Sequence, residues 1–334
     1  DDIVKMQSSS IVKTKKLDIM ESINGLSYIP DNKRIEMTTS CGTPYVQEGI
    51  SKTDLFEEID GVLYPKARIL RDFTEATEKL ESGIVPYLPF SLTLKDERLK
   101  HAKIVDPRTR IFSCANVTHF LVSRRYFYTI LMQFYHSKIY DTFCVPSLDR
   151  ISFDWHRLAS HMLEVGTEGF DFDYTNYDRT LSHQVLYYAT KLLLTGQKVS
   201  QIEEAAIAEL IASPFMIWGD NIFRSNGGLM SGMLITFILN CVANELMHRC
   251  AWVHLMKKSY PQACEIRHYK RYTRGIRGGD DTITTVSSSV SHIYNGKTVA
   301  EYLISCGMQV TAATKDKEIP ELTPFMQLSF LKNT

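Results

Sequence analysis

The hydrophobic pattern is clearest from the middle of the chain onward. After Gly169 the run FDFDY alternates apolar and acidic residues, which is typical of a strand with two different faces. Apolar residues at helical spacing then predict a helix that Ser182 caps and Gly196 ends, followed by a second helix over residues 201–212. Apolar runs at 215–218 and 222–224 flank Gly219-Asp220-Asn221, which predicts a hairpin.

The last third of the chain continues this alternation of helices and hairpins. A long apolar segment predicts a helix from about residue 232 to 255. Strands at 272–276 and 282–286 then bracket the turn Gly278-Gly279-Asp280-Asp281, and a helix at 296–306 ends at Gly307. This order predicts an α+β fold with an antiparallel sheet and helices on one face.

The first part of the chain gives weaker patterns. The first hundred residues mix short patterns with turn signals such as Cys41-Gly42-Thr43-Pro44. Residues 94–114 read as two extended arms around an Asp106-Pro107 turn, and an aromatic-rich helix follows at about 116–137. No repeat or low-complexity linker interrupts these segments.

Composition, charge and cysteine content limit the classes of protein to which this chain can belong. The 334 residues are 44% hydrophobic and 23% charged, which suits a folded chain of about two domains. With 38 basic and 38 acidic residues, any binding of nucleic acid must come from local clusters. The seven cysteines are scattered without a Cys-x-x-Cys pair, which favours a reducing compartment over a zinc ribbon or disulfide framework.

Neither a secretory signal nor a membrane span is expected. The first residues, DDIVKMQSSS, show no basic start followed by an apolar stretch, so no signal peptide is expected. The chain does not begin with Met, which suggests a processed or excised segment. The longest apolar run, residues 229–243, contains Ser, Gly, Thr and Asn and is too short to cross a bilayer.

Three aspartates form the first candidate site. Asp280 and Asp281 are adjacent at a tight turn, an arrangement that is costly unless a cation neutralises it. Asp173 lies at the end of a predicted strand and would add a third oxygen ligand of the kind that Mg²⁺ prefers. Two-metal phosphoryl transfer needs such carboxylates around ions about 3.5–4 Å apart. Taken alone, such residues are more often solvated acids at the surface or at hairpin tips than metal ligands.

A polar stripe in the long helix is the second candidate. If Gly232 opens that helix, Thr236 and Asn240 follow at four-residue steps on one face. Polar groups inside an apolar helix are either buried caps or functional. In the functional interpretation the stripe faces a sugar hydroxyl, and Asp178 bonds to Asn240.

Three segments in this order resemble a known family. FDFDYTNYD, GGLMSGMLITFILN and GGDD are similar to motifs A, B and C of right-handed RNA-dependent RNA polymerases, best matched by the picornavirus-like enzymes of positive-strand RNA viruses. LKDERLKHAKIVDPRTRIF resembles motif F, TTSCGTPYV motif G, VTAATKDK motif D and the final FLK the start of motif E. The likeness extends from about Met37 to the end of the chain.

The resemblance implies a division into fingers and palm. Fingers with motifs G and F are expected at residues 1–130 and as an insertion at 210–229. The palm is expected at 131–209, with motif A, and at 230–334, with motifs B, C, D and the start of E. The family's thumb and further fingers are missing from this pattern, which suggests a piece of a viral polyprotein.

The resemblance also implies roles for single residues. Asp173 and Asp280 would be the principal ligands of two Mg²⁺ ions, with Mn²⁺ as an alternative, and Asp281 would assist. The reaction would be attack of an RNA primer 3′-hydroxyl on the α-phosphate of a nucleoside triphosphate. The other implied residues are Lys95, Lys103, Arg108 and Arg110 for the triphosphate; Asp178, Ser231, Thr236 and Asn240 for the ribose; Lys315, or else Lys317, as general acid; and Thr39, Ser40 and Gly42 for the template.

The sequence departs from the family pattern at two motifs and in one connection. Gly278 stands where an aromatic residue commonly precedes the GDD glycine, and Leu99 stands where motif F often has a basic residue, with Arg98 and Lys100 beside it. The basic segment 255–272 is either a connection that contacts RNA phosphates or a solvated loop.

Two alternatives and several partners remain open. A reverse transcriptase shares the acidic pair, and a non-catalytic RNA-binding fragment of a polyprotein would keep the shape without turnover. The family implies an RNA template and primer, other replication proteins and membrane-associated replication in the host cytoplasm. Initiation from a viral protein primer and initiation from a nucleotide are both compatible with the sequence.

Overall fold

The chain forms two compact units, each built from separated segments. The computed structural model describes residues 2–10, 12–29, 32–96, 98, 109–138, 141–144, 146–149, 151–313 and 318–331. The first unit comprises Asp1–Ile11, Gln133–Val185 and Phe237–Thr334, and the second comprises Val12–Met132 and Leu186–Thr236. The sequence-based division placed residues 186–209 with the segment before them, whereas in the structure they group with the second unit.

The first unit is built on an antiparallel sheet. Its strand order is β10-β5-β9-β8, and β11 also pairs with β5. The strands are β5 (Glu168–Tyr174), β8 (Thr273–Gly278), β9 (Asp281–Val286), β10 (Val310–Thr311) and β11 (Thr323–Pro324). The helices are α1 (Asp2–Ser9), α7 (Phe153–Met162), α8 (Tyr177–Thr180), α12 (Tyr269–Tyr272) and α13 (Gly296–Ser305). The long helix α11 (Thr236–Ser259) begins at the boundary between the two units. Short 3₁₀ turns lie at Pro261–Ala263, Ile266–His268 and Phe325–Gln327.

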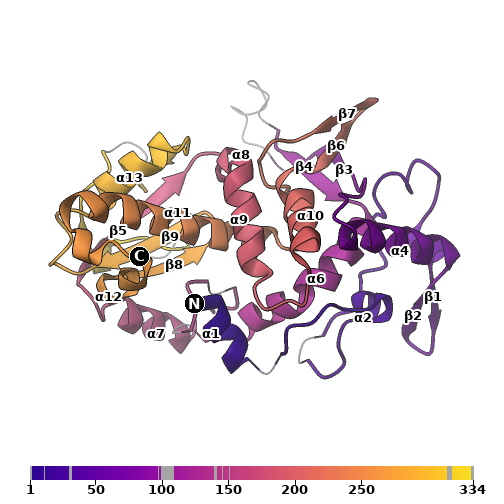
Figure 1. Cartoon of the computed structure of the whole chain (residues 1–334), viewed down its shortest axis with the longest axis horizontal. Helices are drawn as coiled ribbons and strands as arrows, with labels where there is room; N and C mark the ends of the chain where they lie inside the picture. The colour runs from indigo at the N-terminus through magenta and orange to yellow at the C-terminus, as the bar shows by residue number, and fades with distance from the viewer. Residues whose placement is uncertain are drawn as a thin grey trace. The chain divides into compact units, whose positions relative to one another are not determined.

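Helices lie on both faces of this sheet, not on one face as the sequence predicted. On one face Phe170 stacks on His248 of α11, with ring centroids 6.1 Å apart, and lies against Gly296 at the start of α13. On the other face Ile276 and Ile283 form a buried cluster with residues of α7 and of the C-terminal segment, namely Leu158, Met162, Leu328 and Phe330. Figure 1 shows α11, β8 and β9 of this unit in orange, α13 in yellow-orange and β5 in pink.

The second unit contains two hairpins joined into one sheet. Its order is β4-β3-β6-β7, and β3 pairs with β6 in parallel. The strands are β1 (Phe56–Ile59), β2 (Val62–Pro65), β3 (Phe90–Leu94), β4 (Ile111–Ala115), β6 (Phe215–Trp218) and β7 (Asn221–Arg224), of which β1 and β2 form a separate hairpin. The helices are α2 (Ile19–Asn24), α3 (Lys52–Leu55), α4 (Ala67–Glu81) and α10 (Gln201–Ala212), while α6 (Val117–Tyr135) and α9 (His183–Leu193) continue across the unit boundaries.

Most elements expected from the second half of the sequence are confirmed. The helix at 201–212, the strand at 168–174 and the two hairpins occur where the patterns predicted them. The helix α4 was missed, although its buried residues Ile69, Phe73, Ala76 and Leu80 follow helical spacing. In the described part of the chain, no helix is both long enough and apolar enough to cross a membrane.

Replacing Gly169 by Ala is expected to destabilise the first unit. A Cβ at this position would lie 2.1 Å from the carbonyl oxygen of Thr284, where β5 and β9 pair. The strands must separate to admit it, so we expect a loss of about 1–3 kcal/mol in the free energy of unfolding. Urea denaturation measures this loss. The exposed residue Glu301 on α13 provides a control, because Glu301→Ala should change that free energy by less than about 0.5 kcal/mol.

Candidate active site

Strand register brings the acidic residues to one edge of the sheet. Phe172 pairs with Thr282 across β5 and β9, so Asp173 and Asp281 are the next residues toward the same edge. Because side chains alternate along strands, both face away from Phe172 and from α11. The Asp173 carbonyl accepts a hydrogen bond of 3.1 Å from the Thr311 hydroxyl of β10, which holds this end of β5 in the ladder. Asp280 is exposed at the tip of the turn.

The turn that carries Asp280 is fixed by two contacts from α11. Gly279 has a φ of +80°, as the first position of a tight type II′ hairpin turn requires. Its N–H donates to the sulfur of Cys241 at 3.1 Å, and its carbonyl accepts a hydrogen bond of 3.1 Å from the side-chain amide of Asn244. Both contacts are buried, so the position of the turn is set by the helix behind it.

The same helix holds the segment that follows Asp173. The Asn240 amide donates to Asp178 Oδ1 at 2.7 Å, as the sequence predicted. Tyr177 donates from its hydroxyl to the Asn240 carbonyl at 3.2 Å, and Tyr174 donates to Asn244 Oδ1 at 3.4 Å. One face of α11 therefore contacts both acidic segments.

Electrostatics link Asp178 to the turn. Burial raises the pKa of Asp178, the Asn240 hydrogen bond acts in the opposite direction, and the charge of Asp280 raises the pKa further. The net shift is upward, because burial dominates. Asp280 also contributes to the raised pKa of Tyr174, after the larger effect of burial. These couplings place Asp178 and Asp280 within one electrostatic neighbourhood.

The donor set suits a hard divalent cation that brings other ligands with it. Asp173, Asp280 and Asp281 supply carboxylate oxygens from neighbouring strand ends. Among the described residues, no three His, Cys, Asp or Glu side chains converge as a ready-made metal site. Mg²⁺ is usually held by one or two carboxylates together with water and substrate phosphates, so such a site does not need to be preformed. The residues present fit a metal that is completed by substrate.

Ser231 and Thr236 belong to the second unit, and their hydroxyls are engaged there. Ser231 Oγ lies 3.1 Å from the hydroxyl of Ser113 on β4, and Thr236 donates to the carbonyls of Met230 and Met233. The helix begins at Thr236 and not at Gly232 as predicted. The reason is a tertiary contact: Gly232 lies against β4, where a Cβ would be 1.9 Å from the Ser113 carbonyl oxygen.

Of the other candidate residues that the sequence suggested, some lie within the described part of the chain and others do not. Lys95 and Arg110 are exposed just beyond paired strands β3 and β4, and the Lys95 N–H donates to the Arg110 carbonyl at 2.8 Å. Thr39 and Ser40 are exposed in a turn, where the Ser40 hydroxyl accepts from the Gly42 N–H at 3.1 Å. Lys103, Arg108 and Lys315 lie outside the described residues, as does Lys317.

Bulky side chains lie close to Gly278 and leave little room for a larger residue there. A Cβ on Gly278 would lie 2.9 Å from Leu331 Cδ2 and 3.2 Å from Phe330 Cζ. Phe330 and Leu331, in the segment that resembles the start of motif E, therefore occupy the space beside Gly278.

Several residues of this site were missed from the sequence. Asn244 and His248 continue the four-residue step from Thr236 and Asn240, so the polar stripe was longer than the one identified. Arg277 is fully buried in β8, although it directly precedes the acidic turn. Because side chains alternate along β8, Arg277 lies on the opposite face from Ile276, the face that α11 covers, and no local pattern in the sequence shows that this face is buried.

The pKa of Asp178 should respond to its two neighbours in opposite directions. In metal-free buffer, Asn240→Ala removes a hydrogen bond to the carboxylate and is expected to raise the pKa further above its ordinary value. Asp280→Asn removes a nearby negative charge and is expected to lower it. Carbon-detected NMR titration of the Asp178 carboxyl measures both shifts. Shifts of the same sign in the two variants would contradict this account of the site.

Parts of several viral polyproteins are similar in sequence to this chain. The chain is 28% identical to part of the genome polyprotein of Rice tungro spherical virus (strain A), over 96% of this chain and 10% of that polyprotein. It is 26% identical to the replicase polyprotein of Drosophila C virus (strain EB), over 99% of this chain and 20% of that polyprotein. The RNA1 polyprotein of Cowpea mosaic virus (strain SB) is 27% identical over 96% of this chain and 18% of its own length.

A solved structure shows the same fold. The Sicinivirus 3Dpol RNA dependent RNA polymerase matches with a TM-score of 0.76 at 21% identity, covering 99% of this chain and 66% of that protein. The present chain thus spans slightly less than two thirds of that protein and a small part of each related polyprotein. The family model described as viral RNA-dependent RNA polymerase matches residues 1–334. The chain belongs to the viral RNA-dependent RNA polymerase family.

Proposed function

We propose that this protein catalyses template-directed synthesis of RNA in the replication of a picorna-like positive-strand RNA virus. The observation that carries the proposal is the meeting of Asp173 with Asp280 and Asp281 at one sheet edge, beside the bonded pair Asp178–Asn240. Membership of the family and the viral polyproteins among its relatives support it. The reaction is transfer of a nucleotidyl group from a nucleoside triphosphate to an RNA 3′-hydroxyl, with release of pyrophosphate.

In this proposal the three aspartates hold two Mg²⁺ ions, for which Mn²⁺ can substitute. When bound, such ions activate the attacking oxygen and neutralise charge on the leaving group. The protein's own contribution is placement, because phosphoryl transfer depends mainly on positioning and charge stabilisation. The contacts from Cys241 and Asn244 to Gly279 supply that placement for the turn.

Recognition of the ribose would fall to Asp178. Its carboxylate is oriented by the Asn240 amide and can accept a hydrogen bond from a 2′-hydroxyl, the group that distinguishes RNA precursors from DNA precursors. This argues against the reverse transcriptase alternative, which needs no group that recognises a ribose. The further residues that we assign by family likeness are Ser231 and Thr236 for the nucleotide; Lys95, Lys103, Arg108 and Arg110 for the triphosphate; Lys315 as general acid; and Thr39, Ser40 and Gly42 for the template.

We also propose the setting in which the reaction occurs. The polyprotein relatives support a role alongside other viral proteins. The family resemblance implies an RNA template and primer, and replication in the cytoplasm of the host cell at membrane-associated complexes. A viral protein primer is one way in which such synthesis begins.

Removing the carboxylate of Asp280 should abolish nucleotide incorporation without unfolding the protein. Asp280 is exposed at its turn, so we expect Asp280→Ala to unfold at the temperature of the unmodified chain while activity falls by at least about 100-fold. Primer extension on an RNA template with Mg²⁺ measures activity. Asp220 is a matched control, because it is exposed and follows Gly219 in another hairpin turn. Activity retained in Asp280→Ala would refute the metal-binding role.

Asp178→Ala should weaken the preference for ribonucleotides over deoxyribonucleotides. A site that hydrogen-bonds a hydroxyl loses discrimination when the partner group is removed, and we expect the ratio of kcat/KM values to fall by about tenfold or more. Single-nucleotide extension with both substrate types measures the ratio. Asp154→Ala, an exposed change on α7, should leave the ratio unaltered. If the unmodified chain prefers deoxyribonucleotides, it is a reverse transcriptase and the proposal fails.

A further inference from the structure

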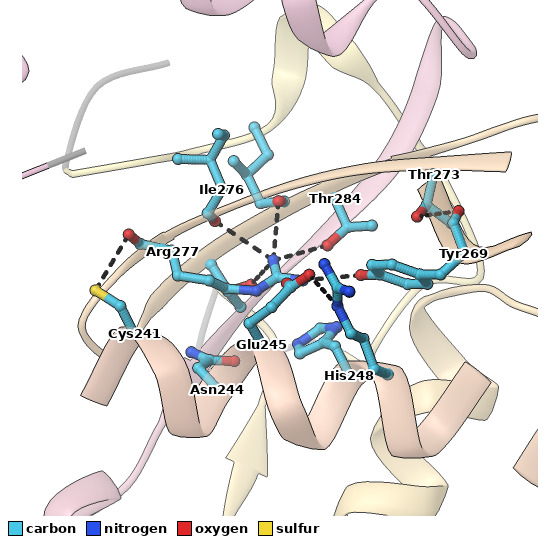
Figure 2. A network of polar contacts seen from close by, with 12 residues as sticks. Cys241, Asn244, Glu245, His248, Tyr269, Thr273, Ile276, Arg277 and Thr284 are labelled. Atoms are coloured by element: carbon cyan, nitrogen blue, oxygen red, sulfur yellow. Dashed lines mark hydrogen bonds and ion pairs between the residues drawn. The ribbon is translucent and has the colours of Figure 1, made fainter. Parts of the chain in front are cut away.

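A buried arginine stands directly before the turn that carries Asp280. The Arg277 side chain is 0% exposed. Its Nη1 donates to the hydroxyls of Thr282 and Thr284 at 2.5 and 2.9 Å and to the Ile283 carbonyl at 3.1 Å, all on β9. Its Nη2 donates to the Tyr269 hydroxyl at 3.1 Å. The guanidinium thus joins the two strands that flank the turn and the helix α12 (Figure 2).

The main chain of Arg277 is held as firmly as its side chain. The N–H donates to the Phe143 carbonyl at 2.7 Å, and the carbonyl accepts from the thiol of Cys241 at 3.4 Å. Gly275 makes room for the guanidinium, because a Cβ there would lie 2.6 Å from Arg277 Nη2. The local sequence RGIRGGDDTIT therefore contains both the space and the hydroxyl partners that this arginine needs.

The charge of Arg277 is balanced by Glu245 of α11. Glu245 Oε2 lies 3.0 Å from Arg277 Nη2 without the alignment of a hydrogen bond, so the contact is an ion pair. Glu245 is only 5% exposed, and its other oxygen accepts from Arg249 Nε at 2.8 Å. Arg249 in turn pairs with Asp2 of α1, and Asp2 pairs with Lys270 at 2.7 Å. Figure 2 shows Glu245 on the helix directly below Arg277.

A buried ion pair of this kind is a poor source of stability. Removing two charges from water costs several kcal/mol per ion, and apolar residues of similar volume often serve the fold as well. The location of the pair indicates instead a role in holding neighbouring segments in position. Glu245 follows Asn244, which bonds the Gly279 carbonyl, and lies five residues after Asn240, which bonds Asp178. The ion pair therefore connects the helix that orients Asp178 to the strand that leads into the turn.

We propose that Arg277, with Glu245 as its counter-charge, is a positioning residue of the polymerase site. The pair sets the β8–β9 turn against α11 and thereby sets Asp280 and Asp281 relative to Asp173 and Asp178. Arg277 itself touches neither substrate nor metal; it acts through the turn. The expected effect of the Arg277–Glu245 pair on turnover rests on the proposed function. The expected effect of the pair on the position of the turn does not depend on that function.

Four variants separate positioning from folding. Arg277→Met and Glu245→Gln each leave a buried charge without its partner, and we expect both to lower the unfolding temperature by several degrees, roughly 5 °C or more. The double variant Arg277→Met/Glu245→Met removes both charges, and Arg249 keeps its ion pair with Asp2, so the double variant should unfold within about 3 °C of the unmodified chain. Arg277→Lys keeps the charge but loses the planar fork that reaches three partners on β9. Arg157→Met on α7 is the control, because Arg157 is 55% exposed and pairs with Asp154.

The first measurement is steady-state primer extension with Mg²⁺, on variants that are folded at the assay temperature. Displaced carboxylates should slow the chemical step, so in the double variant and in Arg277→Lys we expect kcat to fall by about tenfold or more. The KM for the nucleoside triphosphate should stay within about twofold, because the binding groups are untouched. The control should keep both values. Full kcat in a folded double variant would overturn the proposal.

The second measurement needs neither RNA nor metal. Amide hydrogen exchange followed by mass spectrometry should show faster exchange in the turn peptide 276–283 of the double variant, with unchanged exchange in α13. Equal exchange in the turn would overturn the positioning role, whatever the activity. If the unmodified chain makes no RNA, the proposed function fails, and hydrogen exchange still decides whether Arg277 positions the turn.

Discussion

The polar face of α11 is the constraint on which the first unit depends. A helix packed against a sheet usually presents apolar residues to it, but α11 presents Asn240, Asn244, Glu245 and His248, all buried. Each of these buried polar groups has to find a partner or incur a desolvation cost. Three of the partners lie in the segments around the acidic residues: Asp178, the Gly279 carbonyl and Arg277. Satisfying the helix therefore fixes the place of those segments.

Because side chains alternate along β5, one face of the sheet packs against α11 and the other carries the aspartates. Phe170 and Phe172 face α11, while Asp171, Asp173 and Asp281 face the other side. Asp171 is used structurally, since its carboxylate accepts a hydrogen bond of 2.7 Å from the Ser329 N–H. Asp173, two residues later and on the same side, reaches the open edge beside the turn. A single strand thus supplies one aspartate that anchors the C-terminal segment and one at the candidate active site.

Several buried contacts hold the turn at which the chemistry is expected. The turn at 279–280 is held from behind by a thiol, an amide and a buried guanidinium, and little is left to side-chain conformational freedom. Placement of this kind suits phosphoryl transfer, in which small displacements of charge are costly. Gly278 fits the same scheme, because Phe330 and Leu331 pack where a larger side chain would otherwise stand. The C-terminal segment therefore supports the turn from its other flank.

Local patterns in the sequence determined much of this protein. Period-two and helical spacing located β5, α10 and the hairpin around Asp280, because these signals depend only on neighbouring residues. The order of the three motifs identified the family, and the chemistry of Asp178 and Asn240 predicted their hydrogen bond. These features are dictated by short segments, so the amino-acid sequence alone was enough to predict them.

Only the tertiary structure decided which distant segments meet. Strand register set Asp173 beside Asp281, and packing against β4 moved the start of α11 from Gly232 to Thr236. The parallel pairing of β3 with β6 joins segments more than a hundred residues apart, for which no local pattern exists. The role of Arg277 was hidden for the same reason: a charged residue in a sequence suggests solvent until the partner that neutralises it, here Glu245, is placed against it by the fold.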